Sequence, residues 1–182
     1  MENTKVLESS EIENEEPEVL ILKVLIKDNP VRNDDISGNV LILSDRMQQA
    51  SKLLGDYLET VTKMKFIGVV NRLADLKTVD EKVDYLIIYG HLENDDNHNL
   101  IHELRNKSNK ITTIFYASVS RVVKEDVKNN DVKFLFNRFA PLEMFLIMLE
   151  RLFDRYDRDD KHGIKVDINS RTLDWEFSGW HV

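Results

Sequence analysis

Short apolar runs recur along this chain, separated by stretches with the periodicity of amphipathic helices. The first run lies in the segment from Asn39 to Asp45, NVLILSD, where four consecutive apolar residues end on Ser44 and Asp45. A short, continuous apolar run is typical of a strand that is buried on both faces of a parallel sheet. Four similar runs follow, so the predicted strands are 40–43, 66–70, 85–89, 111–116 and 132–136.

The stretches after these strands predict covering helices. Two helical faces are clear, one made of Ala50, Leu53, Leu54, Tyr57, Leu58 and Val61, the other of Leu142, Phe145, Leu146, Leu149, Phe153 and Tyr156. Shorter helices are expected near 100–104 and 119–127, the latter capped by Ser118 or Ser120. Right-handed crossovers place such helices on both faces of a sheet, so the chain is predicted to be an α/β protein with a five-stranded parallel (βα)₅ sheet.

Composition excludes several function classes. The net charge of −8 argues against unspecific binding to nucleic acid or anionic lipid, and the absence of cysteine excludes disulfides and thiolate chemistry. The amino terminus is acidic where a signal peptide would be basic, and the longest apolar runs fall far short of a membrane span. We therefore expect a soluble cytoplasmic protein with no membrane contact.

Residues 1–38 are predicted to form an extension before the main domain. Residues 1–17 are rich in glutamate and read as a mobile acidic arm. The apolar run 19–26 has four β-branched residues and no polar helical stripe, so a strand is predicted there. It could extend the sheet at its edge or pair with another copy of the chain, and the sequence leaves both open. Residues 31–38 read as a loop.

Residues 39–157 resemble the receiver domain of bacterial response regulators, which has the flavodoxin-like (βα)₅ fold. The resemblance rests on strand spacing and on four strings: NVLILSD, VDYLIIYG, ITTIFYAS and VKFLFNRFAPLEMF. A working receiver has a carboxylate pair after its first strand for Mg²⁺ and an aspartate ending the third strand that accepts the phosphoryl group. It also has a Thr or Ser ending the fourth strand and a Lys ending the fifth, which neutralise charge.

The corresponding positions here are Ser44 and Asp45, then Tyr89, Tyr116 and Asn137. Only Asp45 keeps the expected chemistry, because a tyrosine cannot form an acyl phosphate and one carboxylate is a poor Mg²⁺ site. The resemblance therefore implies a degenerate receiver, a pseudoreceiver, with no catalytic residue, no metal and no cofactor. Phe134 stands where active receivers have a switching aromatic residue; alternatively, it is a core strand residue.

Other candidate sites are weaker. His91, His98 and His102 cluster in sequence, and the last two have the i, i+4 spacing of a metal pair. No acidic motif accompanies them, so exposed helix histidines are the simpler interpretation. The six glycines are scattered singly, which excludes a glycine-rich phosphate loop.

Residues 158–182 are predicted to be a charged linker followed by short antiparallel strands. The string IKVDINSRTLDWEFSGWHV resembles the strands that precede the winged helix in OmpR/PhoB-type transcription factors. In that case the recognition helix would be absent, and any DNA contact would need a domain that this chain lacks. The alternative is that these strands pack on the receiver-like domain, and both interpretations stay open.

The resemblance therefore implies that the chain is a signalling and dimerisation module that works without phosphorylation. It would be the regulatory part of an atypical OmpR/PhoB-like regulator. In that family the face formed by the fourth helix, fifth strand and fifth helix makes symmetric dimers, and here it would carry Arg121, Lys124, Glu125, Lys133, Glu150, Arg151, Asp154 and Arg155. A second hypothesis is a stand-alone adaptor that binds a protein partner through 19–26 or the tail. A third, a flavodoxin-like enzyme that binds nucleotide or flavin, is disfavoured by the bulky residues at the strand ends.

Overall fold

The computed structural model describes residues 15–28, 32–72, 74–75, 79, 81–92, 99, 101–103, 106, 111–129, 132 and 134–162, with side chains as far as Leu152. The predicted acidic arm before residue 15 and the predicted β tail after residue 162 lie outside these residues. Among the described residues, no helix is long and apolar enough to cross a membrane.

The centre of the fold is a five-stranded parallel sheet in the order β2-β1-β3-β4-β5. Its strands are β1 (Ser37–Leu43), β2 (Lys63–Val70), β3 (Tyr85–Tyr89), β4 (Thr112–Ala117) and β5 (Phe134–Asn137). All five predicted strands are confirmed, with shifts of up to three residues at their ends. This strand order is that of the flavodoxin-like receiver fold, as predicted.

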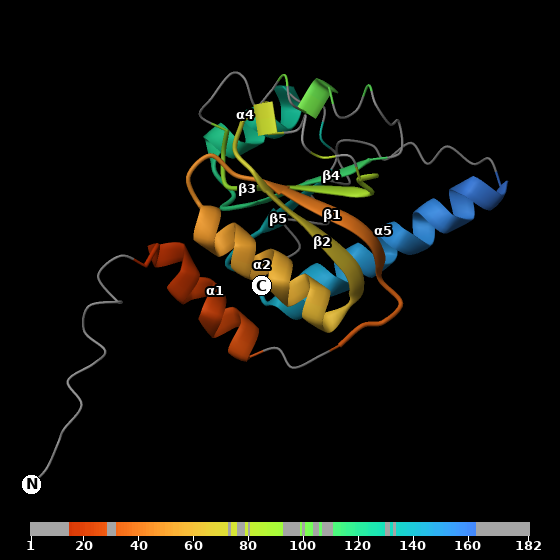
Figure 1. Cartoon of the computed structure of the whole chain (residues 1–182), viewed down its shortest axis with the longest axis horizontal. Helices are drawn as coiled ribbons and strands as arrows, with labels where there is room; N and C mark the ends of the chain where they lie inside the picture. Colours follow the sequence, from red (N-terminus) through yellow and green to blue (C-terminus); the bar gives the residue numbers. More distant parts are fainter. Residues whose placement is uncertain are drawn as a thin grey trace, which may run out of the picture.

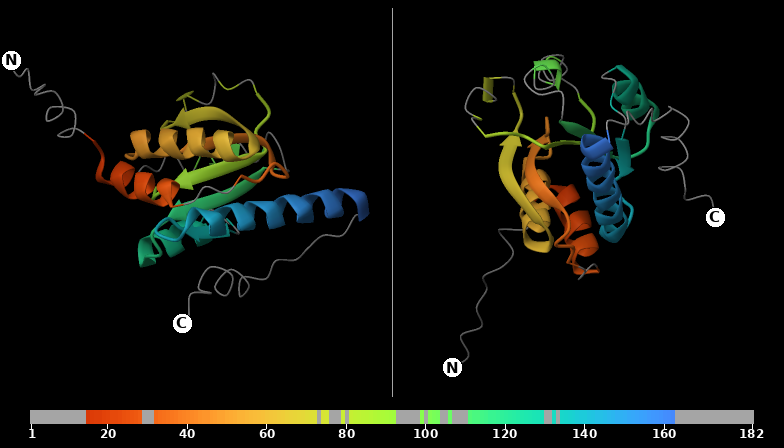
Figure 2. Two further views of the ribbon diagram at one scale, coloured as in Figure 1. Left: turned by 90° about the horizontal axis from the view of Figure 1, so that it is seen from below. Right: turned by 90° about the vertical axis from the view of Figure 1, so that its right-hand side faces the viewer.

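Helices cover both faces of the sheet (Figures 1 and 2). On one face lie α1 (Pro17–Lys27), α2 (Gln48–Val61) and α5 (Leu142–His162), and on the other lies α4 (Arg121–Asn129). The alternation of strand residues explains the two cores: Val40 and Ile42 face the first set of helices, while Leu41 and Leu43 face the second. Ser120 caps α4, as predicted, because its Oγ accepts a hydrogen bond from the Val123 N–H at 3.3 Å.

The segment 19–26 forms a helix, so the predicted extra strand was wrong. Helix α1 starts with Pro17 in its first turn, and Val19 and Leu22 are buried in the same core as Val40. Leu25 and Ile26 pack against that core from the next turn. Burial at positions 19, 22, 25 and 26 follows a helical repeat, and tertiary packing of this kind overrides the modest strand preference of β-branched residues.

The predicted linker at 158–162 is also helical, because α5 continues to His162. The sequence places opposite charges four residues apart along this end of the helix, at Asp154 and Arg158, Arg155 and Asp159, and Asp157 and Lys161. Such i, i+4 spacing favours continuation of a helix in water, even where no apolar face remains to be buried. Charge density alone was therefore a poor indicator of a linker.

Candidate functional site

The predicted pocket residues lie where the carboxyl ends of β1, β3, β4 and β5 meet, at one edge of the sheet (Figure 1). Ser44 is completely buried there, and its Oγ accepts a hydrogen bond from the Met47 N–H at 3.0 Å and donates one to the Tyr89 carbonyl at 3.4 Å. The Gln48 side-chain amide donates to the Ser44 carbonyl at 2.6 Å. Ser44 therefore shapes the turn from β1 into α2.

Tyr89 and Tyr116 lie side by side on neighbouring strands, with ring centroids 5.1 Å apart. The Tyr116 ring continues into an aromatic cluster, 5.9 Å from Phe136 and 5.0 Å from Phe145. Tyr116 is completely buried, and its hydroxyl donates to the Arg138 carbonyl at 3.3 Å. Both tyrosines belong to the core that faces α1, α2 and α5. The two side chains thus form a packed aromatic layer under this edge of the sheet.

Burial raises the pKa of both tyrosines above the ordinary value, because the charged phenolate would lose its hydration. For Tyr89 the negative charge of Glu18 adds to this increase in pKa, and the positive charge of Arg138 opposes it. Both phenols are therefore neutral at physiological pH, which suits packing and hydrogen-bond donation and opposes use of either oxygen as a nucleophile.

This raised pKa predicts a loss of stability at alkaline pH. Unfolded tyrosines lose their protons above pH about 10, whereas the folded ones keep theirs, so the unfolding free energy falls as pH rises from about 10 toward the folded pKa. We expect a loss of about 1.4 kcal/mol for each tyrosine at pH 11 relative to pH 9. Urea unfolding of the wild type and of a Tyr89→Phe/Tyr116→Phe variant measures it, and equal pH dependence in the two proteins would contradict the prediction.

The remaining predicted site residues are a turn residue, a half-buried carboxylate and a core aromatic residue. The Asn137 Oδ1 accepts a hydrogen bond from the Phe139 N–H at 3.1 Å, so this side chain forms the turn that leads into α5. Asp45 is half-buried directly after Ser44. Phe134 is buried in the core opposite Ile114 of β4, which fits its alternative interpretation as a core strand residue.

Helix α1 brings two glutamates to this edge that the sequence did not mark. Glu18 forms an ion pair with Arg138 at 2.9 Å, and both side chains are largely buried, 17% and 13% exposed. The Arg138 guanidinium also lies 3.2 Å from the Met47 sulfur. Since Arg138 directly follows Asn137 and Met47 directly precedes α2, this contact fastens α1 over the ends of β1 and β5.

Glu16 fastens α1 to the start of α2. Its carboxylate accepts hydrogen bonds from the Gln49 and Ala50 N–H groups at 3.3 and 3.1 Å. The residue before α2, Met47, provides no side-chain cap, so Glu16 satisfies these free backbone donors and stabilises the positive end of the helix dipole. One sequence signal could have indicated this arrangement: a proline directly after an acidic residue, here Pro17 after Glu16, is typical of the first turn of a helix.

The loop after β3 is tied to α4. Asp126 is buried on α4, and its carboxylate accepts a hydrogen bond from the Leu92 N–H at 3.1 Å. His91 and His102 are both exposed, while His98 lies outside the described residues. Within the described part of the chain, no three or more His, Cys, Asp or Glu side chains come together in a way that could hold a metal ion.

Five of the eight residues predicted for a dimer face have described side chains: Arg121, Lys124, Glu125, Glu150 and Arg151. Arg121 and Glu125 form an exposed i, i+4 ion pair at 3.1 Å on α4. A shallow depression of about 410 Å³ lies along this helix, lined by Val119, Ser120, Arg121, Lys124, Glu125 and Lys128. Asp154 and Arg155 lie on α5 without described side chains, and Lys133 lies outside the described residues.

Comparison with solved structures identifies the fold as the receiver fold of response regulators. The BeF₃-activated receiver domain of DrrB is similar over 65% of this chain and 99% of that domain, with a TM-score of 0.51 and 10% identity. The response regulator DrrB, an OmpR/PhoB homologue from Thermotoga maritima, matches over 66% of this chain, with a TM-score of 0.51 and 11% identity. The match spans 54% of that regulator.

No protein-family model matches the sequence, and no curated protein matches it. At 10–11% identity, the likeness to DrrB concerns the fold alone.

Proposed function

We propose that this chain is a receiver-like signalling module that works without phosphoryl transfer. The observation that carries the proposal is the buried pair Tyr89 and Tyr116, which stands where the resemblance to receivers places the phosphoryl acceptor and the neighbouring hydroxyl residue. A neutral, buried phenol is a poor nucleophile for acyl phosphate chemistry. The Glu18–Arg138 ion pair further supports the proposal, because it places a carboxylate and a cation of this chain close enough to Tyr89 for both charges to affect its pKa.

Treatment with acetyl phosphate and Mg²⁺ tests this chemistry. We expect the intact mass of the protein to stay unchanged, because no carboxylate occupies the Tyr89 position and Asp45 has no second carboxylate beside it in sequence. An active receiver domain treated in the same way serves as the positive control. A stable phosphoprotein whose formation is lost in an Asp45→Asn variant would contradict the proposal.

The output of such a module is a protein–protein interaction. We propose homodimerisation through the face of α4, β5 and α5, which carries the cations Arg121, Lys124 and Arg151 and the anions Glu125 and Glu150. A surface that carries both charges suits a two-fold interface, because a cation of each copy can then pair with an anion of the other. We further propose a place in an OmpR/PhoB-type transcription regulator in the cytoplasm, as the sequence resemblance implies, with DNA contact made by a separate domain. Sedimentation velocity tests this face: the wild type should form a concentration-dependent dimer, and Arg151→Glu should weaken it.

One observation favours the adaptor hypothesis as a second candidate. Helix α1 has apolar side chains on its outer as well as its inner face, and an outer apolar face is typical of a surface that binds protein.

A further inference from the structure

Two glutamates at the amino end of α1 fasten this helix to the rest of the chain. The Glu16 N–H donates to the Gln49 Oε1 at 3.4 Å, and the Glu16 carboxylate accepts hydrogen bonds from the Gln49 and Ala50 N–H groups. Glu18 pairs with Arg138 at 2.9 Å. Together these contacts form a latch between the amino end of α1 and the edge of the sheet where β1 and β5 end.

The ion pair in this latch is incompletely hydrogen-bonded. Glu18 Oε2 and Arg138 Nε are buried and have no hydrogen-bond partner. Burial of charged groups is unfavourable unless their remaining polar atoms are also bonded. Opening of the latch would hydrate both groups, so it is less unfavourable than the loss of a fully bonded ion pair.

The apolar contacts of α1 are few. Its buried residues are Val19 and Leu22, and Leu25 and Ile26 are half-buried, whereas α2 buries seven residues. With 11 residues, α1 is also shorter than the roughly 12–15 residues at which an isolated helix becomes marginally stable in water. A short element with little buried apolar surface is typical of a unit that opens before the rest of a protein unfolds.

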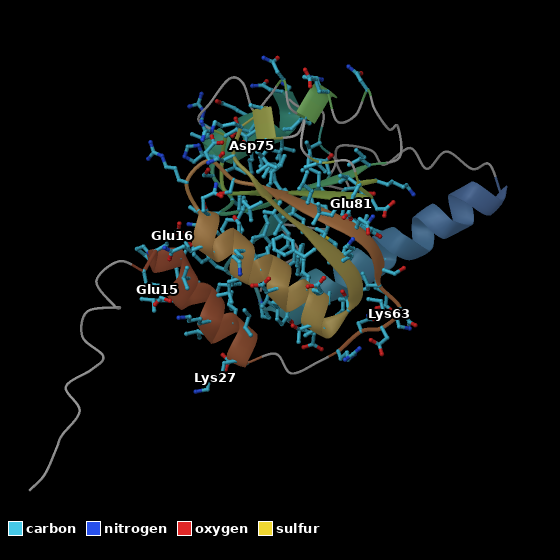
Figure 3. All side chains as sticks on the ribbon, viewed as in Figure 1. Glu15, Glu16, Lys27, Lys63, Asp75 and Glu81 are labelled. Atoms are coloured by element: carbon cyan, nitrogen blue, oxygen red, sulfur yellow. The ribbon has the colours of Figure 1, made fainter. Side chains whose placement is uncertain are left out.

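The sheet is complete without α1. Its five strands pair with one another, and α1 contributes no strand. After α1 the described chain is held again where α2 ends, because the Asn33 N–H donates to the Val61 carbonyl at 2.7 Å and the Lys63 N–H to the Ile36 carbonyl at 2.9 Å. Glu16 lies beside the start of α2 and Lys63 just beyond its end (Figure 3). Release of α1 would therefore leave this second attachment and every strand pair intact.

We propose that α1 is a releasable strap, which opens as a unit while the sheet stays folded and thereby uncovers Tyr89. Tyr89 is buried in the same core as Val19 and Leu22. Besides burial, the charges of Glu18 and Glu16 raise the pKa of its phenol, so its side chain lies near the latch. The strap goes beyond the proposed function, because neither its contacts nor its opening involve a phosphoryl group.

Hydrogen exchange of the full chain, followed by mass spectrometry, tests whether α1 opens by itself. We expect the amides of residues 21–27 to exchange about a hundredfold faster than those of β3 and β4, relative to the rates in an unfolded chain. Equal protection of α1 and these two strands would overturn the strap.

A core variant on the other face of the sheet separates opening of α1 from global unfolding. Val123 is buried on α4 in the core that contains Leu86 and Phe115. Val123→Ala weakens packing that persists when α1 alone opens, so we expect exchange about tenfold faster in β3 and β4 and unchanged in α1. The milder Ile88→Val in the same core gives the same comparison. An equal increase in α1 and in the strands would overturn the strap.

The role of the latch is tested by Glu16→Ala, which should speed the exchange of α1 about fivefold, as the loss of a helix cap does. Asp56 is the matched control, because it is an exposed carboxylate of α2 that pairs with Lys52 of the same helix. This pair persists when α1 opens, so Asp56→Ala should leave the exchange of α1 unchanged. The same exchange rate of α1 in both variants would contradict the latch.

Nitration with tetranitromethane tests whether opening uncovers Tyr89. We expect Tyr89 to react about tenfold faster than Tyr116, whose completely buried ring is packed between Phe136 and Phe145. Glu16→Ala should speed the reaction of Tyr89 by the same factor as the exchange of α1. Equal rates for the two tyrosines, or a Tyr89 rate that Glu16→Ala does not change, would contradict the uncovering of Tyr89.

Discussion

Replacing Arg138 with leucine is expected to lower the free energy of unfolding by about 3 kcal/mol, because the change leaves Glu18 charged and largely buried with no partner. The ion pair has a single close contact at 2.9 Å, and Glu18 Oε2 and Arg138 Nε have no hydrogen-bond partner. The free-energy cost of removing these two charges from water is therefore only partly offset by their attraction, even in the wild type. Urea unfolding at neutral pH measures the effect.

A double variant separates the ion pair from other effects of the substitution. In Glu18→Leu/Arg138→Leu both charges are gone, so we expect most of the lost stability to return, as is general for buried ion pairs replaced by apolar residues. The exposed Arg121–Glu125 pair is the matched control, and Glu125→Ala should cost less than about 0.5 kcal/mol. If the double variant is as unstable as Arg138→Leu alone, unpaired charge is not the cause.

Truncating Tyr116 to alanine is expected to cost about 4 kcal/mol of unfolding free energy, because it opens a cavity within the aromatic cluster. Tyr116 is among the largest completely buried side chains of the described residues, and its ring contacts those of Tyr89, Phe136 and Phe145. Chemical denaturation, followed by the far-UV circular dichroism signal of the backbone, measures this loss in free energy of unfolding.

Tyr116→Phe is the matched control for that cavity. It keeps the ring and removes only the 3.3 Å hydrogen bond to the Arg138 carbonyl, so we expect a cost of about 1 kcal/mol. Equal losses for the alanine and phenylalanine variants would mean that the hydroxyl, and not the ring packing, makes the main contribution.

Several elements could be predicted from the sequence because their signals are local. The strand 85–89 was predicted with its observed bounds, since a strand buried on both faces must be apolar at every position. The helical faces that begin at Ala50 and Leu142 were equally clear, because their apolar residues repeat at helical spacing. The parallel sheet followed from the alternation of these two patterns.

The site was predictable only in part. Strand spacing brought Ser44, Tyr89 and Tyr116 to one edge of the sheet, where the structure has them. The two residues of the ion pair at that edge, Glu18 and Arg138, are 120 positions apart in the chain, and nothing local in the sequence links them. Glu16 likewise reads as one acidic residue among many until its contact with the start of α2 is known.

The sequence by itself determined the five strands, the helices that follow β1 and β5, and the tyrosine that ends the third strand, because composition and periodicity act over a few residues. Only the tertiary structure decided that residues 17–27 form a helix, where that helix packs and which charges it pairs. An apolar segment without clear periodicity adopts whichever conformation buries it best. That choice depends on the apolar core residues of α2 and on Arg138, which are distant in the sequence.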